Sequence, residues 1–163
     1  MNPHQKSTGW KVPFLFCVVI LALVYAASFL KKKPEIPELP QELMRIASAT
    51  HLNLDNSDGK AWQTLIRDSA AGFQGNEIKD GKLAEILDAA LASKRFDAAC
   101  AAFIHIRDEK MREEKLKRIH TAAIKNCPNL QWSVFAIHSS RSQESIDQMS
   151  HELLARWHEC RSE

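Results

Sequence analysis

The clearest folding signal in the chain lies in Ala89-Ala90-Leu91-Ala92-Ser93-Lys94-Arg95-Phe96-Asp97-Ala98-Ala99-Cys100-Ala101-Ala102-Phe103. On both sides of its polar centre, apolar residues recur every three or four positions, the spacing that places them on one face of a helix. The stretch therefore predicts two helices joined by a short turn. Their core positions are Leu83, Ile86, Leu87, Ala90 and Leu91 before the turn, and Phe96, Ala99, Cys100, Phe103 and Ile106 after it.

Toward the N-terminus the same spacing predicts two further helices. The first follows Pro40, because proline is favoured at a helix start. The second has Asp58 available as its N-cap, and Gly72 and Gly75 mark its end. The expected core positions of the two helices are Leu43, Ile46, Ala47, Trp62, Leu65, Ile66, Ser69 and Phe73.

Toward the C-terminus a highly charged helix is expected over about residues 110–126, ended by Pro128, and a last helix from about Gln143, capped by Ser142. No stretch alternates apolar and polar residues long enough to predict a strand. Residues 41–163 are thus expected to form an all-α domain of six or seven helices. The expected core positions in this part are Leu116, Ile119, Ala123, Trp132, Phe135, Ala136, Ile146, Met149, Leu153 and Trp157.

The alanine-rich stretch resembles the centre of tetratricopeptide-like helical hairpins, in which small residues let two helices approach and a large aromatic residue fills the gap. The resemblance implies a short α-solenoid of stacked hairpins. A compact helical bundle with small residues at its crossings fits the spacing as well. Apolar positions also recur at a nearly constant offset, about the length of one hairpin, when Phe103, Ile106, Leu116, Ile119 and Ala123 are set against Phe135, Ile137, Ile146, Met149 and Leu153.

Residues 12–30 form an uncharged apolar run that follows a short basic tail, residues 1–11. As a helix this run would span roughly 28 Å, close to the thickness of a bilayer core. The sequence therefore predicts a single membrane-spanning helix that acts as a signal anchor.

A cleavable signal peptide, cut after Ala26, is the alternative interpretation of this segment. Three features favour an uncleaved anchor. The run is longer than a usual signal core, it continues through Phe29 and Leu30, and it ends in Lys31-Lys32-Lys33, which resembles a stop-transfer flank.

The side of the membrane on which the domain lies is less clearly indicated. Residues 31–33 give the C-terminal flank more lysines than Lys6 and Lys11 give the N-terminal flank, which slightly favours a cytoplasmic domain over an extracytoplasmic one. The domain holds an odd number of cysteines, so an oxidising compartment would leave at least one unpaired. In an exported domain, Cys127 would pair with Cys100 or Cys160.

Residues 31–40 are expected to be a stiff spacer, because Pro34, Pro37 and Pro40 recur at every third position. The whole chain has 22 basic and 20 acidic residues, and the segment 1–33 holds five of the basic ones and no acid. The rest of the chain therefore has fewer basic than acidic residues. This balance provides no basic face for nucleic acid, which is excluded as a partner.

No catalytic or cofactor-binding motif is found, so neither catalytic residues nor a cofactor are expected. The histidines and cysteines lack the spacing of a zinc motif. A metal or enzymatic site assembled across helices, from His105, His120, Cys127 or His158, is kept as an alternative. Cys100, with two alanines on each side, is expected to be a core residue rather than a reactive thiol. The run 107–118 mixes charges, with Glu113 four before Lys117 and Glu114 four before Arg118, and is expected to be a self-paired solvated face.

Together, these features predict a non-enzymatic, membrane-anchored helical domain that binds another protein, as an adaptor or assembly factor of a membrane complex. An exported inhibitor or immunity-type partner is a second hypothesis. Tryptophan is the commonest residue at binding hot spots. Trp62, Trp132 and Trp157 are therefore the interface candidates, although a core role is an alternative for each.

Overall fold

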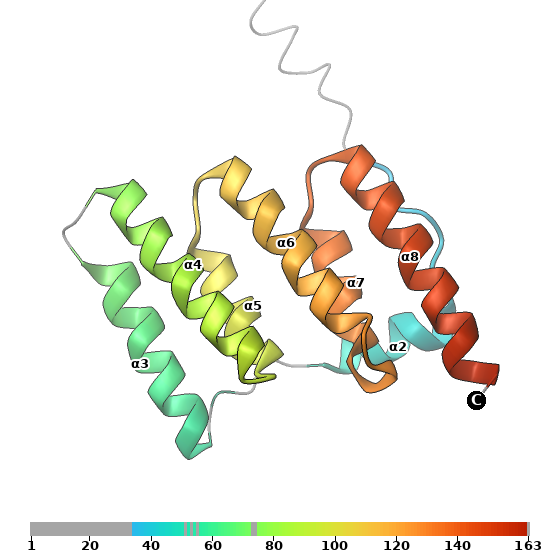
Figure 1. Ribbon diagram of the computed structural model, residues 1–163, viewed down its shortest axis with the longest axis horizontal. Coiled ribbons are helices and arrows are strands. Elements are labelled where there is room, and N and C mark those ends of the chain that lie inside the picture. The colour runs from blue at the N-terminus through green and yellow to red at the C-terminus, as the bar shows by residue number, and fades with distance from the viewer. Residues whose placement is uncertain (1–33, 51, 53, 55, 73–74, 163) are drawn as a thin grey trace, which may run out of the picture. The chain divides into compact units, whose positions relative to one another are not determined.

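The structure, a computed structural model, describes residues 34–50, 52, 54, 56–72 and 75–162. Within these residues the chain forms seven α-helices, one short 3-10 helix and no strand, which confirms the predicted all-α class and the number of helices (Figure 1). In chain order the elements are α2 (Gln41–Ala49), α3 (Ser57–Ala71), α4 (Asn76–Ala92), α5 (Phe96–His105), α6 (Glu109–Ala123), η1 (Cys127–Asn129), α7 (Leu130–Ser139) and α8 (Gln143–Ser162).

The expected membrane-spanning segment, residues 12–30, lies outside the described residues, as does the basic tail, 1–11. Over the described ranges, no helix combines the length and the apolar character that crossing a bilayer requires. The described part of the spacer, residues 34–40, is neither helix nor strand. Its beginning is held against α8, because the Glu35 N–H donates to Oε1 of Gln143, and Nε2 of Gln143 donates to the Glu35 carbonyl.

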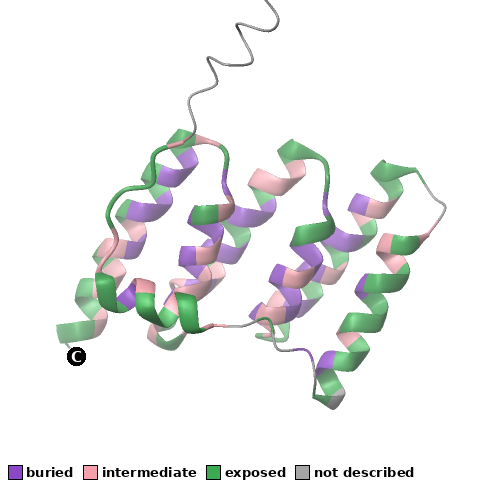
Figure 2. Cartoon of the chain, turned by 180° about the vertical axis from the view of Figure 1, so that it is seen from behind, coloured by how far each residue is buried: buried purple, intermediate pink, exposed green. Residues whose placement is uncertain are grey.

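The helices are arranged as successive antiparallel pairs. α4 packs on α5, α6 packs on α7, and α6 lies between α4 and α8 (Figure 1). α3 packs against both α4 and α5 at one end of this row, and α2 packs against α7. Buried residues gather on the helix sides that face a neighbouring helix, whereas the outer sides of α2 and α3 are largely exposed (Figure 2).

The helix starts recur with a nearly constant period. The helices α4, α6 and α8 begin at positions 76, 109 and 143, and the helices α5 and α7 begin at positions 96 and 130. This period is slightly longer than the offset predicted from the apolar positions. The predicted offset was too short because an apolar residue that lies one helical turn before the equivalent position also fits the helical spacing.

The predicted turn between α4 and α5 is present and tight. Lys94 adopts a left-handed backbone conformation with φ 58°. The Lys94 N–H donates to the Leu91 carbonyl, and the Arg95 N–H donates to the Ala90 carbonyl, so the end of α4 is satisfied by the turn itself. Arg95 and Asp97 then form a two-bond ion pair at the start of α5.

The helix N-termini are capped by side chains at three places. Ser142 caps α8 as predicted, because its Oγ accepts the Ser145 N–H. The predicted cap of α3 was wrong, since Asn56 rather than Asp58 caps this helix by accepting the Gly59 N–H. Asp108 caps α6 by accepting the Met111 N–H. A side-chain oxygen near the first turn satisfies an amide that has no partner inside the helix.

Most predicted core positions are buried, eight are half-buried and two are exposed. Leu65 of α3 is 52% exposed and Ile46 of α2 is 44% exposed. Both helices have neighbours on one side only, so a residue one step around the helix from the buried stripe faces solvent. Phe73 lies outside the described residues. The buried positions that the spacing predicted are Leu43, Ile66, Leu83, Leu87, Ala90, Phe96, Ala99, Cys100, Phe103, Ile106, Leu116, Ile119, Ala123, Ala136, Ile146, Met149 and Leu153.

A disulfide ties the end of the last helix to the connection between α6 and α7. It joins Cys127 of η1 to Cys160 of α8, whose Cα atoms are 5.8 Å apart. Cys100 is free and buried, as expected of a core residue. Burial raises the pKa of its thiol, so its reactive thiolate form is strongly disfavoured.

Candidate functional site

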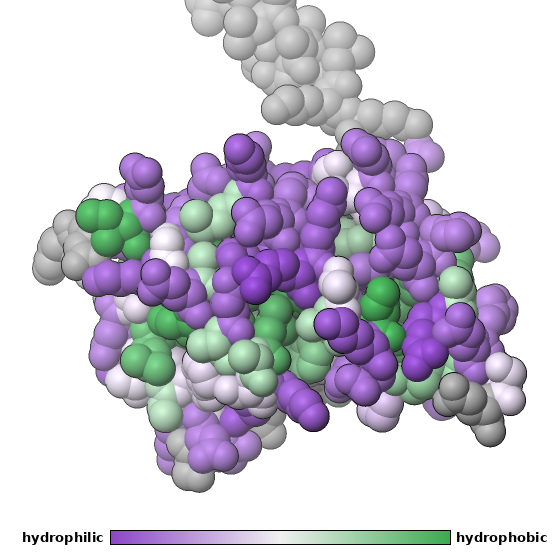
Figure 3. All heavy atoms as spheres, in the orientation of Figure 1, coloured by the Kyte–Doolittle hydropathy of each residue, from purple (hydrophilic) through white to green (hydrophobic). Residues whose placement is uncertain are grey.

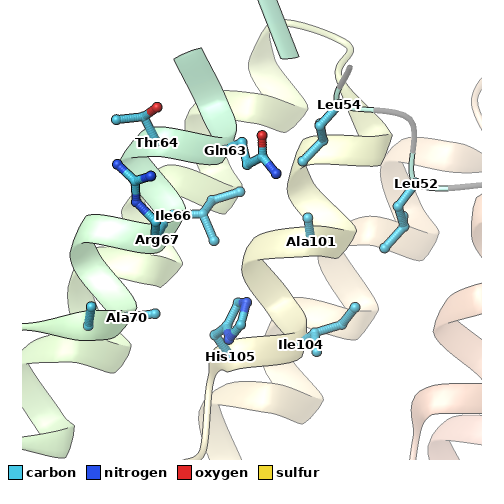
Figure 4. Close-up of a pocket in the computed structure, with 11 residues that line it drawn as sticks. Leu52, Leu54, Gln63, Thr64, Ile66, Arg67, Ala70, Ala101, Ile104 and His105 are labelled. Carbon is cyan, nitrogen blue, oxygen red and sulfur yellow. The ribbon is translucent and has the colours of Figure 1, made fainter. Parts of the chain in front are cut away.

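A groove of about 660 Å³ lies between α3 and α5 and is called here the α3–α5 groove (Figure 4). Ile66 forms part of its floor and is 4% exposed, whereas Ile104 on its rim is 53% exposed. Apolar side chains therefore line a hollow that is open to solvent. The lining residues are Leu52, Leu54, Gln63, Thr64, Ile66, Arg67, Ala70, Ala71, Ala101, Ile104 and His105.

The groove exists because α3 covers α5 incompletely. α3 buries Ile66 and Gly59 against its neighbours, and its other described side chains are half-buried or exposed. Opposite it, α5 presents the small Ala101, which leaves room between the two helices. A hollow with apolar walls is suited to taking apolar side chains of a ligand, whose removal from water is favourable.

One end of the α3–α5 groove is polar. Figure 4 places Ala70, Ile104 and His105 together at this end, away from Gln63 and Leu54. The same three residues line a second, smaller pocket of about 200 Å³. Its other walls are the polar residues Asn76, Lys79, Asp80 and Arg107, together with Leu83.

Asp80 is a buried acidic residue that lines this polar end. It is 3% exposed, and its carboxylate accepts the Arg107 N–H at 3.1 and 3.2 Å and the Asp108 N–H at 2.7 Å. The backbone therefore satisfies the charge of Asp80. Within the described chain, the side chains of Lys79 and Arg107 form no ion pair, so the two positive charges at this end are left for solvent or a ligand.

A separate groove of about 280 Å³ lies between α2 and α7. Trp132 and Phe135 form its α7 wall, and Met44 and Ala47 form its α2 wall. Trp132 also stacks on Phe96 with ring centroids 6.3 Å apart. It therefore serves the core and lines a concave surface at the same time.

The other two interface candidates lie on different helices. Trp62 of α3 and Trp157 of α8 are half-buried and pack against the core, and neither lines a described pocket. Arg161 lies over the Trp157 ring at 5.7 Å. No ring contact between described residues joins two of the three tryptophans. They lie on three different helices, and the interface assignment of each is still a prediction.

His120 sits in a buried cluster that resembles a nucleophilic triad in its partners. Nδ1 of His120 is 2.7 Å from Oγ of Ser133, and Nε2 is 2.9 Å from Oε2 of Glu152. An ionised carboxylate can only accept hydrogen bonds. The neutral ring therefore donates a hydrogen bond from Nε2–H to Glu152 and accepts one at Nδ1 from the Ser133 hydroxyl. Ser133 is fully buried and lines none of the described pockets, so the cluster ties α6, α7 and α8 together and offers no accessible nucleophile.

Burial and hydrogen bonding together set the protonation states of this cluster. Desolvation lowers the pKa of His120 and outweighs the opposing effect of the hydrogen bond that His120 donates to Glu152. The pKa of Glu152 is lowered by hydrogen bonds from Gln148 and His120. The histidine is therefore held neutral and the carboxylate charged.

The proposed zinc ligands are not brought together. The sulfur of Cys127 is bound in the disulfide, and both ring nitrogens of His120 are hydrogen-bonded. His105 and His158 are exposed on α5 and α8. The described residues contain no group of three or more metal-binding side chains.

The charged run 107–118 forms part of a hydrophilic face over α4, α6 and α8 (Figure 3). Its pairing differs from the prediction, because the described residues show neither a Glu113–Lys117 nor a Glu114–Arg118 ion pair, and the shortest ion pair of α6 in this run joins it to α4. Lys115 and Arg118 both bind Oδ2 of Asp88 on α4, at 2.9 and 2.7 Å, and Glu113 binds the loop before α8. A neighbouring helix offers closer partners than the next turn does.

The α3–α5 groove was not predicted from the spacing of apolar residues in the sequence. A groove arises where a neighbouring helix is absent, and periodicity reports only which face of a helix is apolar. The one available signal was Ile104, an isoleucine adjacent to the predicted stripe position Phe103. No protein-family model, curated protein or solved structure matches the chain.

Proposed function

We propose that the chain is a single-pass membrane protein whose helical domain binds another protein through the α3–α5 groove, as an adaptor or assembly factor of a membrane complex. The observation that carries the proposal is the exposed apolar lining of this groove, with Ile104 53% exposed on its rim. Exposed apolar surface in a concave site is costly in water and marks binding sites.

The successive hairpins support a tetratricopeptide-like assignment of the domain. The helix starts at positions 76, 109 and 143 recur with a period close to the length of that repeat. Each such unit buries its face against the next, and the surfaces left uncovered serve as binding surfaces. The apolar run of residues 12–30 supports the anchor.

We place the domain on the extracytoplasmic side, which the lysine count disfavoured slightly. The Cys127–Cys160 disulfide supports this placement, because such bonds persist in oxidising compartments and are rare in the cytosol. The disulfide also supports the second hypothesis, an exported inhibitor or immunity-type partner. A cleaved export signal would remove residues 1–26 and an anchor would retain them, which the mass of the mature protein distinguishes.

Quantitative affinity capture tests the proposal. The full chain is recovered from detergent-solubilised membranes as wild type, Ile104→Gln and Leu65→Gln. Leu65 is a matched control, because it is 52% exposed on α3 and does not line the groove. We expect Ile104→Gln to reduce the recovery of a specific partner roughly tenfold and Leu65→Gln to leave it unchanged. Equal recovery with all three proteins would contradict the proposal.

A further inference from the structure

The α3–α5 groove and the polar pocket beside it form one continuous surface. They share Ala70, Ile104 and His105, so a ligand that fills the apolar groove reaches Lys79 and Arg107 at its end. The two pockets thus present apolar walls followed by positive charge. Partner surfaces that match this order carry apolar groups followed by negative charge.

The dimensions of the groove suit a short extended segment. Its wall on α3 runs from Gln63 to Ala70, a rise of roughly 10 Å at 1.5 Å per residue. An extended peptide covers this length with about three residues. The Gln63 amide, drawn toward α5 in Figure 4, lies within the groove and is suited to bonding a peptide backbone.

The charge at the polar end is positive on balance. Asp80 is the acidic residue of the pocket, and its carboxylate is already bound by three backbone hydrogen bonds. Lys79 and Arg107 carry two positive charges without ionic partners in the described chain.

We propose that the α3–α5 groove binds an extended peptide segment of about three apolar residues followed by acidic residues, whose carboxylates pair with Lys79 and Arg107. This inference rests on the proposed function and names the chemistry of the partner. A fatty-acid anion also combines an apolar part with a carboxylate. The peptide is favoured because the groove is open to solvent along its rim, as the exposed Ile104 shows, and would leave much of an acyl chain in water.

The test uses fluorescein-labelled peptides with amidated C-termini and the full chain in lipid nanodiscs. The peptides are Leu-Ala-Leu-Gly-Glu-Glu and the same sequence ending in Gln-Gln or Lys-Lys, with empty nanodiscs as the background. We expect fluorescence anisotropy to show the Glu-Glu peptide binding roughly fivefold tighter than the Gln-Gln peptide, and the Lys-Lys peptide binding weakest. Sodium oleate is added as a competitor.

Charge reversal makes the result specific to the pocket. The double variant Lys79→Glu, Arg107→Glu should reverse the order of the three peptides. The control Lys110→Glu, Lys117→Glu changes the same net charge on α6, away from the groove, and should preserve the order. Circular dichroism verifies that each variant is folded. Ile104→Gln, which leaves the charges of the pocket unchanged, should weaken the binding of all three peptides.

Three outcomes would overturn the inference: no peptide binding above the empty-nanodisc background, a peptide order unaffected by Lys79→Glu, Arg107→Glu, or oleate binding with which no peptide competes. The last would assign the groove to a lipid anion. If partner recovery in the capture experiment still depends on Ile104 while peptide charge has no effect, the proposed function stands and this inference fails. If neither depends on Ile104, both fail.

Discussion

Asp80 on α4 and Glu113 on α6 make the same contact in successive hairpins. Asp80 accepts the backbone N–H groups of Arg107 and Asp108, just before α6. Glu113 accepts the backbone N–H of Arg141 and the hydroxyl of Ser140, just before α8. In each case an acid on one helix holds the loop that leads to the equivalent helix of the next unit, 27 or 28 residues later.

This repeated contact predicts that Asp80→Ala destabilises the domain by about 2–4 kcal/mol, because the substitution leaves two backbone amides of a buried site without their charged acceptor. Glu113→Ala should cost less, because Glu113 is half-buried and water reaches its partners more easily. Urea unfolding of the two variants measures the difference. A larger loss for Glu113→Ala would contradict the account of the contact.

The helices could be predicted from the sequence because apolar spacing is a local property, and α4 and α5 follow it closely. Contacts between segments that are far apart in the sequence could not be predicted in this way. Ser133 and Glu152 lie 13 and 32 residues from His120, and no spacing rule joins them. The cysteine pairing was open for the same reason, and Leu65 was misassigned because its exposure depends on which neighbours α3 has.

Stability should fall as the pH is lowered below about 6.5. The pKa of His120 in the folded protein lies below its ordinary value of 6.5. As the pH falls, the unfolded chain is therefore protonated at His120 before the folded protein is, and stability is lost between pH 6.5 and the folded pKa. Glu152, whose folded pKa lies below its ordinary 4.5, adds a further loss as the pH falls through the folded value. Thermal unfolding at pH 8, 6, 5 and 4 gives the profile.

His120→Gln provides the control for this pH dependence. It removes the titrating ring and should make the unfolding temperature flatter between pH 8 and pH 5, although the variant is less stable at pH 8 because a buried hydrogen-bonded site is disturbed. An unchanged slope in His120→Gln would show that another group is responsible.

Reduction of the Cys127–Cys160 disulfide should lower the free energy of unfolding by about 3–4 kcal/mol, the chain-entropy value for a sequence separation of 33. In intact cells, a membrane-impermeant thiol reagent should label these two cysteines only after reduction from outside. Labelling without reductant and only after permeabilisation would refute the extracytoplasmic placement. A Cys17→Ser background removes the cysteine of the apolar run from the readout.

Two glycine substitutions should have opposite effects. A Cβ at Gly59 would lie 2.6 Å from backbone atoms of Leu54, so Gly59→Ala should displace this segment and destabilise the domain. A Cβ at Gly81 meets no atom within 4 Å, and Gly81→Ala should stabilise α4 by about 0.5–1 kcal/mol. The midpoints of urea unfolding of both variants, compared with that of the wild type, test this prediction. If Gly59→Ala stabilises the protein, the close approach of Leu54 is not real.

The most direct test of the central claim, that the α3–α5 groove is a protein-binding site, is photocrosslinking in intact cells. A benzoylphenylalanine is placed at position 104 or, as the equally exposed control, at position 65 of the full chain. The account predicts a discrete protein adduct from position 104 and none from position 65. Adducts of equal yield from both positions, or none from position 104, would contradict it.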